Sequence, residues 1–244
     1  MIDLRGRRAL VTGGSRGIGA ATARLLARAG ADVMIGYRSR SADAKRVVDA
    51  INALGVKASS HAADIATRAG AEALVDATVR ELGGLDLFVA NAGVWAAEDI
   101  GVADMDDARW SRTIRENVDA MFLTTRAVAR VITDGGRIVF VSSTAGQRGE
   151  AFHADYGASK GAVISFTKSL AVELASRGVT VNSVAPGWVD TEMVADAMAA
   201  EGRDRINAGI PLGRIASAED IAGPIVFLCS PLARHITGEI LNVN

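Results

Sequence analysis

Tyr156 and Lys160 stand four residues apart in the stretch Tyr-Gly-Ala-Ser-Lys, so both side chains fall on one face of a helix. An ammonium beside a phenol favours the phenolate, and we expect Lys160 to lower the pKa of Tyr156 from its free value of about 10. A shift to near 7 requires roughly 4 kcal/mol of differential stabilisation. Such a phenol exchanges a proton at neutral pH. Taken alone, the pair is more typical of half-exposed helix surface, so the other motifs must decide.

A glycine-rich turn follows the first apolar run of the chain. Residues 8–12 predict a strand, the sequence Gly-Gly-Ser-Arg-Gly-Ile-Gly occupies 13–19, and residues 20–29 predict a helix that stops at Gly30. The glycines let backbone N–H groups approach a phosphate, and the helix N-terminus adds a favourable dipole. The pattern therefore indicates a phosphate site, although a tight strand-to-helix turn explains one or two of the glycines.

Basic residues stand where many NAD-binding folds carry an acidic one. That acidic residue usually lies about 20 residues beyond the glycines, but here Tyr37 lies 18 residues past Gly19. Arg38 and Arg40 follow it, and Arg16 lies in the glycine turn. Because an arginine pairs with a 2′-phosphate, the pattern favours NADP(H), with NAD(H) as the alternative. In the competing interpretation these arginines are solvated loop charges.

Strands alternate with helices along the whole chain. The hydrophobic pattern predicts strands at 8–12, 32–37, 56–61, 85–90, 137–141, 179–184 and 238–244, and helices at 20–29, 43–54, 67–82, 118–132, 154–176 and 218–230. This alternation predicts an α/β fold, in which residues 1–244 form one domain with a Rossmann-type, doubly wound parallel sheet between two helical layers. Short helices in the polar segment 188–211 predict a substrate lid.

Polar residues follow several predicted strands, at the edge where open α/β sheets bind ligands. Asn91 ends one strand, and Ser142 and Ser143 end another, where they either join a site or satisfy loop backbone groups. Asp64 either accepts a hydrogen bond from an adenine amino group or caps the helix that follows. Asn117 is either a helix cap or packing amide, or a polar group reserved for a site.

Together these motifs resemble the short-chain dehydrogenase/reductase family in its compact form, over essentially the whole chain. The matching residues, in the expected order, are Thr12-Gly13-x-x-x-Gly17-x-Gly19, Asn91-Ala92-Gly93, Asn117, Ser143, Tyr156-x-x-x-Lys160 and Pro186-Gly187. The resemblance implies a seven-stranded Rossmann-type sheet and an enzyme that transfers hydride with a nicotinamide nucleotide.

The resemblance also implies roles for individual residues. Tyr156 is expected to be the general acid in carbonyl reduction and the base in alcohol oxidation. Lys160 holds the nicotinamide ribose and tunes the phenol, Ser143 hydrogen-bonds the substrate oxygen, and Asn117 positions a water that links Lys160 to solvent. The residues expected to bind the cofactor are Gly13, Ser15, Arg16, Gly17, Ile18, Gly19, Tyr37, Arg38, Ser39, Asp64, Ile65, Asn91, Ala92, Gly93, Tyr156, Lys160, Pro186, Gly187, Val189 and Thr191.

The substrate is less sharply indicated. The residues expected near the substrate are Trp95, Gln147, His153, Trp188 and Met193, although the general pattern favours a solvated loop position for His153. Within the family, residues 59–64, 156–166 and 178–186 are similar to the 3-oxoacyl-[acyl-carrier-protein] reductases. Those enzymes commonly carry a basic residue before the strand at 137–141 to dock the acidic carrier, but Thr133 and Asp134 stand there, which argues against such docking.

We therefore expect an NADP(H)-dependent reductase acting on a 3-oxoacyl thioester or small ketone. The alternatives are an NAD(P)+-dependent alcohol or sugar dehydrogenase and a cofactor-binding regulator without turnover. The resemblance implies a homotetramer built through the helices at 118–132 and 154–176. The net charge of −1 argues against nucleic-acid or anionic membrane surfaces, and no residue cluster has metal-ligand spacing.

The remaining composition indicates a cytoplasmic protein. Residues 1–8 lack the apolar stretch of a signal peptide, and the chain has no apolar run long enough for a membrane span. The single cysteine, Cys229, lies in an apolar run and is expected to be buried and inert.

Overall fold

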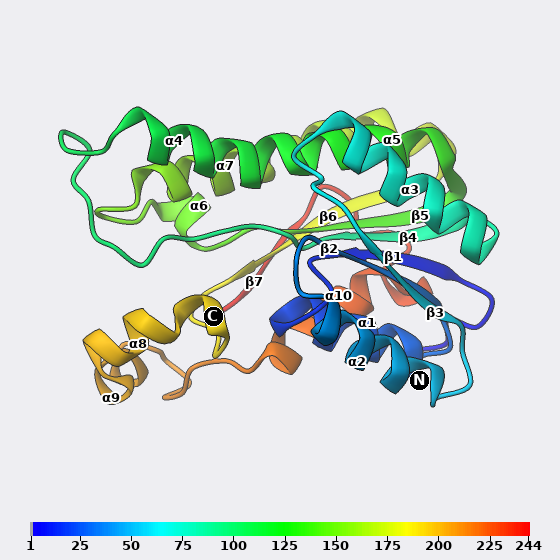
Figure 1. Ribbon diagram of the computed structural model, residues 1–244, viewed down its shortest axis with the longest axis horizontal. Coiled ribbons are helices and arrows are strands. Elements are labelled where there is room, and N and C mark those ends of the chain that lie inside the picture. Colours follow the sequence, from blue (N-terminus) through cyan, green and yellow to red (C-terminus); the bar gives the residue numbers. More distant parts are fainter. Residues whose placement is uncertain (1) are drawn as a thin grey trace.

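Seven parallel strands form one sheet in the order β3-β2-β1-β4-β5-β6-β7 in the computed structural model, which describes residues 2–244 (Figure 1). The strands are β1 (Arg8–Thr12), β2 (Asp32–Tyr37), β3 (Ala58–Ala62), β4 (Leu85–Ala90), β5 (Ile132–Val141), β6 (Thr180–Pro186) and β7 (Ile240–Val243). The predicted doubly wound sheet is confirmed. The strand order reverses between β1 and β4, and such a reversal opens a crevice at the carboxyl ends of the strands.

Helices cover both faces of the sheet. Helices α1 (Gly17–Arg28), α2 (Ser41–Asn52) and α10 (Ala218–Leu228) lie on one face, and α3 (Arg68–Leu82), α5 (Ala120–Val131) and α7 (Ala154–Glu173) on the other (Figure 1). Because side chains alternate along a strand, Val11 and Val89 enter the first core while Leu10 and Phe88 enter the second. Cys229 is buried in the first core, as predicted.

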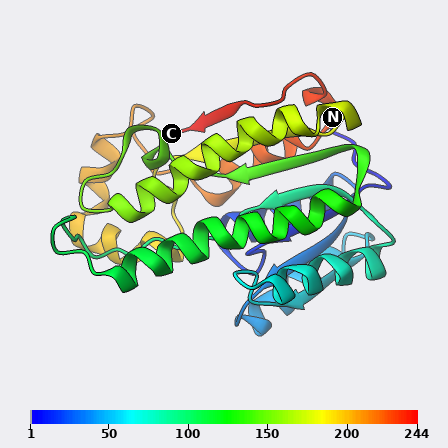
Figure 2. The same ribbon diagram turned by 90° about the horizontal axis from the view of Figure 1, so that it is seen from above.

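The helix that carries Asn117 is longer than expected and is interrupted by a wider turn. It begins with α4 (Asp107–Ile114), continues through the π-helical turn η1 (Arg115–Asp119) and ends as α5, so the three pieces form one rod beside α7 (Figure 2). The side chain of Asp106 caps its start by accepting from the backbone N–H of Arg109 at 2.6 Å. Asn117 therefore caps no helix and lies inside the π-turn, a feature frequent at functional sites.

Two other elements differ from the sequence-based expectation. Strand β5 begins at Ile132, five residues earlier than expected, because Ile132 pairs with Leu85 and the register then shifts. Gly135 and Gly136 lie within this irregular strand. The short helix α6 (Ala145–Arg148), directly after β5, was not expected.

The segment 188–211 forms short helices at one end of the molecule, as the sequence suggested (Figure 1). They are η3 (Glu192–Val194), α8 (Ala195–Glu201) and α9 (Arg203–Ala208), while η2 (Ala175–Arg177) and η4 (Pro231–Ala233) lie elsewhere. Met198, Ile206 and Ile215 form a small apolar cluster separate from the two main cores. Within residues 2–244, no helix is both long and apolar enough to cross a membrane.

Gly19 marks the closest approach between α1 and the ends of β1 and β4. A Cβ atom at this position would lie 2.3 Å from the carbonyl oxygen of Gly13 and 2.6 Å from Nδ2 of Asn91. That amide donates to the carbonyl oxygen of Thr12 at 3.0 Å, so it is held by the backbone that it approaches. The glycine turn therefore depends on the absence of a side chain at residue 19.

We predict that Gly19→Ala lowers the free energy of unfolding by roughly 1–3 kcal/mol, because backbone must move to admit the methyl group. Urea denaturation of both proteins measures the difference. Gly209→Ala is the control: Gly209 has a φ of −83°, and a Cβ there would meet its nearest atom at an ordinary 3.5 Å. Equal unfolding midpoints for Gly19→Ala and the wild type would contradict the packing argument.

Candidate active site

A cavity of about 320 Å³ opens at the carboxyl ends of β1, β4, β5 and β6. All the residues expected to bind the cofactor line it except one, namely Gly13, Ser15, Arg16, Gly17, Ile18, Tyr37, Arg38, Ser39, Asp64, Ile65, Asn91, Ala92, Gly93, Tyr156, Lys160, Pro186, Gly187, Val189 and Thr191. The exception is Gly19, which packs beneath the turn. The structure thus brings together residues that are up to 178 positions apart in the sequence, from Gly13 to Thr191.

The glycine turn presents an uncapped helix N-terminus to this cavity. Helix α1 starts at Gly17, and the preceding residue, Arg16, has an extended backbone and makes no side-chain capping bond. Gly13 and Gly17 have φ values of 64° and 52°, which favour glycine. The first N–H groups of an α-helix have no partner within the helix, so the turn fits the phosphates of a dinucleotide.

Thr12 joins the glycine turn to the end of β4. Its hydroxyl oxygen accepts from the backbone N–H groups of Asn91 at 3.0 Å and Ala92 at 3.1 Å. Residues 91–93 therefore border the cavity from a fixed position beside the turn.

The arginines expected to read a 2′-phosphate lie at the rim and are held by carboxylates. Glu192, in η3, accepts from Nη1 of Arg16 at 2.5 Å and from Nη2 of Arg40 at 3.1 Å. Arg38 pairs with Glu116 at 3.2 Å. These side chains are not freely solvated charges, and the contact with Glu192 ties the segment 188–211 to the rim.

Asp64 also lines the cavity, and it does not cap the following helix. The cap of α3 is Thr67, whose hydroxyl oxygen accepts from the backbone N–H of Gly70 at 3.1 Å. One oxygen of Asp64 accepts from the backbone N–H of Ala66 at 3.1 Å, and the other lies 3.5 Å from Arg115. Of the two interpretations of Asp64, the helix cap is wrong.

Ser143, Tyr156 and Lys160 meet where β5 ends beside α7, and all three line the cavity. The ammonium of Lys160 is buried and donates to the carbonyl oxygen of Val141 at 2.8 Å. Its Nζ lies 5.7 Å from the centroid of the Tyr156 ring. The hydroxyl oxygen of Ser143 accepts from the backbone N–H of Ala145 at 3.1 Å, so this serine satisfies a loop group as well as facing the cavity.

Burial governs the ionisation of the tyrosine and the lysine. Burial disfavours the phenolate and outweighs the hydrogen bond with Ser143, so it raises the pKa of Tyr156 to about 12. Burial likewise disfavours the ammonium and lowers the pKa of Lys160 to about 8. The prediction that Lys160 brings the pKa of Tyr156 towards 7 is wrong for this arrangement, because the ammonium is directed at Val141 and not at the phenol oxygen.

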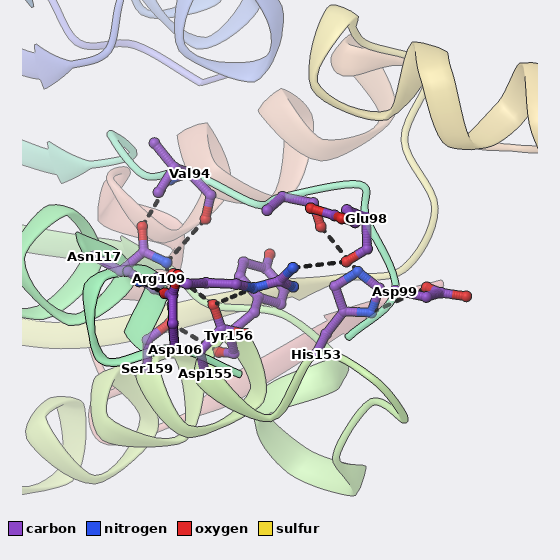
Figure 3. A network of polar contacts seen from close by, with 12 residues as sticks. Val94, Glu98, Asp99, Asp106, Arg109, Asn117, His153, Asp155, Tyr156 and Ser159 are labelled. Atoms are coloured by element: carbon purple, nitrogen blue, oxygen red, sulfur yellow. Dashed lines mark hydrogen bonds and ion pairs between the residues drawn. The ribbon is translucent and has the colours of Figure 1, made fainter. Parts of the chain in front are cut away.

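Asn117 does not line the cavity but holds the loop that does (Figure 3). Its Oδ1 accepts from the backbone N–H of Val94 at 2.7 Å, and its Nδ2 donates to the carbonyl oxygen of Val94 at 2.9 Å and to the hydroxyl of Ser159 at 3.0 Å. A Cβ atom at Gly93 would lie 3.0 Å from this Oδ1 and 3.4 Å from Nζ of Lys160. The amide and the ammonium thus border the same small space, while the relay water stays a prediction.

The residues expected near the substrate divide into three groups. Met193 lines the cavity. The rings of Trp95 and His153 are stacked with centroids 4.9 Å apart, and Trp188 meets Trp95 edge-on at 6.4 Å. Gln147 is exposed and donates to Asn242 at 2.8 Å.

His153 is buried, so the expectation of a solvated loop position is wrong. Its ring nitrogens lie 2.9 Å from the carbonyl oxygen of Ala96 and 3.2 Å from that of Ala151. The stacking on Trp95 and these two polar contacts fix the ring against the loop after β4.

Sequence reasoning missed two features of the site. One is Glu192, which meets Arg16 across 176 positions of sequence. The other is a buried ion pair between Arg109 and Asp155, the residue directly before Tyr156. A charged residue next to the candidate proton donor was the only local signal for the second feature, and nothing in the sequence near Glu192 indicated the first.

Comparisons with known proteins extend over the whole chain. A family model described as "Enoyl-(Acyl carrier protein) reductase" matches residues 13–244. The chain is 42% identical over 245 residues to the 3-oxoacyl-[acyl-carrier-protein] reductase FabG of Vibrio cholerae, with 100% of this chain and 98% of that protein covered. It is 40% identical over 247 residues to the 3-oxoacyl-[acyl-carrier-protein] reductase of Synechocystis sp., with the same coverage.

Two solved structures with bound nucleotides are similar. A short chain dehydrogenase from Burkholderia cenocepacia in complex with NADP has a TM-score of 0.92 and 39% identity, covering 99% of this chain and 97% of that chain. A blue fluorescent protein from a metagenomic library in complex with NADPH has a TM-score of 0.92 and 36% identity, covering 99% and 98%. The likeness therefore includes the arrangement of the entire sheet.

The low pKa of Lys160 predicts a pH dependence of stability. Its pKa of about 8 in the folded protein is below the value of about 10.4 expected in the unfolded chain, so the unfolded chain binds more protons between these values. Stability from this group therefore rises with pH, by roughly 2 kcal/mol from pH 7 to 10. We expect the free energy of unfolding of the wild type, minus that of Lys160→Met, to rise by this amount in urea titrations.

Lys168→Met is the control, because Lys168 is an exposed lysine of the same helix. This variant should follow the wild-type curve across the range. A constant difference between the wild type and Lys160→Met would show that the ammonium is not desolvated in the folded protein.

Proposed function

Since the chain belongs to the short-chain dehydrogenase/reductase family of oxidoreductases, we propose that it is an NADPH-dependent reductase that converts the carbonyl of a 3-oxoacyl thioester to an alcohol. One observation supports the proposal above all: Ser143, Tyr156 and Lys160 line the same cavity as an uncapped, glycine-rich helix N-terminus. The names of the relatives at about 40% identity support the thioester as the substrate class.

Each of the three side chains has a separate task in the proposed reaction. A bound nicotinamide supplies the hydride that reduces the carbonyl carbon. Tyr156 donates its phenolic proton to the carbonyl oxygen, where the electron pair of the C=O π-bond forms the new O–H bond. The electron pair of the hydride would form the new C–H bond and leave the nicotinamide oxidised. Ser143 donates a hydrogen bond to the same oxygen and stabilises the negative charge that develops there. The ammonium of Lys160 holds the ribose and offsets the charge left on the phenolate.

The protonation state of the tyrosine suits the role of proton donor at neutral pH. With its pKa raised to about 12, the phenol of Tyr156 carries its proton at pH 7 and is ready to donate it. Alcohol oxidation needs the phenolate, which burial disfavours. An oxidative alcohol or sugar dehydrogenase would require this phenol to lose its proton first.

The choice of NADPH rests on the arginines at the cavity rim. Arg16, Arg38 and Arg40 place guanidinium groups where an acidic residue would select NADH. Two similar structures carry NADP or NADPH according to their descriptions. A 2′-phosphate carries more charge than the carboxylate of Glu192 and would accept hydrogen bonds from the two arginines that now donate to Glu192.

A small free ketone is the second candidate substrate. The positive charge available to attract an acidic carrier is partly neutralised, because Arg177 pairs with Asp134 at 2.9 Å and Arg130 with Glu72 at 3.8 Å. An acidic carrier protein gains little electrostatic attraction from such a surface, whereas a small ketone needs none. NADPH consumption with acetoacetyl thioesters, β-keto esters, diketones and sugars separates the two candidates.

We predict that Tyr156→Phe lowers kcat for acetoacetyl-thioester reduction by about 10²–10⁴-fold, because the variant lacks the proton donor. The Kd for NADPH, measured by cofactor fluorescence, should stay close to that of the wild type. The parallel loss of NADPH binding would indicate a folding defect. Wild-type turnover by this variant would refute the proposed role of the tyrosine.

We also predict that Glu192→Gln raises kcat/KM for NADPH about fivefold while leaving that for NADH nearly unchanged, because it frees two half-exposed arginines. Steady-state assays with both nucleotides measure the ratio. Glu239→Gln, an exposed carboxylate outside the cavity, controls for the change in net charge. A preference of the wild type for NADH, or no change in the ratio, would contradict the proposed site of the 2′-phosphate.

A further inference from the structure

The rod α4–η1–α5 lies beside helix α7, and both begin at the same end of the molecule (Figure 2). Polar side chains of the two elements meet at that end (Figure 3). Arg109, Thr113 and Asn117 recur every four residues on the rod, and Asp155 and Ser159 are four apart on α7. All five residues are buried, with exposed fractions between 0% and 8%. We call these five residues the polar seam.

The seam contains a buried ion pair. The carboxylate of Asp155 accepts from Nε of Arg109 at 3.3 Å and from the hydroxyl of Thr113 at 2.6 Å. Burial alone would raise the pKa of Asp155, but the hydrogen bonds from Thr113 and Arg109 lower it by more. The pKa is therefore below its usual value, and the carboxylate stays charged. A buried ion pair of this kind is weak support for stability, because apolar residues of similar volume serve at least as well.

The seam runs directly beside the candidate catalytic pair. Tyr156 and Lys160 each follow a seam residue by one position, so each is rotated by about 100° from it around α7. Contacts that hold Asp155 and Ser159 against the rod therefore fix the rotation of the helix, and with it the direction in which the phenol and the ammonium enter the cavity.

The seam also holds the loop between β4 and α4. Nη1 of Arg109 donates to the carbonyl oxygen of Glu98 at 2.8 Å, and Asn117 binds both backbone groups of Val94. The loop is thus tied at two points to the elements that contact α7 (Figure 3). It carries Trp95, which stacks on His153 next to the start of α7.

We propose that Arg109 and Asp155 are positioning residues, which orient Tyr156 towards the carbonyl and hold residues 94–98 at the wall of the substrate site. This inference rests on the proposed reductase function. In this proposal the ion pair aligns the reacting groups and contributes little to the stability of the fold.

The chain offers a matched comparison at the opposite edge of the sheet. Asp86, at the start of β4, accepts from Nε of Arg8 at 2.7 Å and from the hydroxyl of Thr133 at 2.7 Å. The same three residue types therefore form a largely buried unit remote from the cavity. We therefore expect loss of charge at Asp86 to lower stability and to leave the seam unchanged.

The test compares Asp155→Asn with Asp86→Asn. The asparagine at 155 keeps the size of the side chain but leaves Arg109 without a counter-charge. We expect Asp155→Asn to lower kcat at least tenfold, as misplaced reacting groups do, with the NADPH Kd within about threefold of the wild type. Hydrogen–deuterium exchange should become faster in residues 94–106. Asp86→Asn should unfold at lower urea concentration but keep kcat per folded molecule and the exchange of that loop.

A double variant separates positioning from folding. Arg109→Met with Asp155→Leu replaces the pair by apolar side chains and should retain stability, yet it should show the same loss of kcat and the same faster exchange. Wild-type kcat and exchange in the double variant would overturn the proposal, as would an equal loss of kcat in Asp86→Asn. If the wild type reduces no carbonyl, the proposed function fails, and exchange of residues 94–106 still decides whether the ion pair holds the loop.

Discussion

A buried ammonium is the constraint on which the arrangement of the site depends. Lys160 is only 6% exposed, and its Nζ is bonded to the carbonyl oxygen of Val141. A desolvated charge needs partners, and this one has a backbone oxygen at the end of β5. The hydroxyl of Ser142 donates in turn to the backbone carbonyl of Lys160 at 3.0 Å. Helix α7 is therefore fixed to the sheet at the level of the cavity, and the low pKa of Lys160 reflects the cost of burying its charge.

The apolar cores on the two faces of the sheet stabilise the fold and offset the cost of a buried charge at the site. Successive strand residues such as Leu10 and Val11 enter separate apolar cores, and both are fully buried. The polar groups that line the cavity lie at the carboxyl ends of the strands, as Thr12, Asn91 and Ser143 do. This division lets the site retain a buried charge and an uncapped helix end, which an isolated small core would not tolerate.

The features that the sequence predicted correctly are those that leave a pattern within a short stretch of the chain. Apolar runs located the strands, and the glycines at 13–19 and the spacing of Tyr156 and Lys160 located the cavity residues. Contacts between distant segments left no such pattern: the pair between Arg16 and Glu192 spans 176 positions. The apolar run predicted a strand that begins at residue 137, but pairing between β4 and β5 extends it back to Ile132 through Gly135.

The pKa of Tyr156 was misjudged for a related reason. The spacing of four residues to Lys160 gives the distance between two side chains but not the direction of the ammonium, which a backbone carbonyl outside the helix decides. Nor does spacing measure burial, which dominates the ionisation of both groups. Similarly, the position of His153 before a helix suggested exposure, whereas stacking on Trp95 buries it.

The proposed 2′-phosphate site and the segment 188–211 use the same arginines. Glu192 begins η3, and its carboxylate is held by Arg16 and Arg40 at the rim of the cavity. A phosphate that binds these two guanidinium groups competes with Glu192, so the phosphate and the closed contact of η3 weaken each other. Because such coupling is reciprocal, a change that loosens η3 favours the nucleotide that carries the phosphate. Under this proposal, competition for Arg16 and Arg40 links the choice of cofactor to the freedom of the segment 188–211.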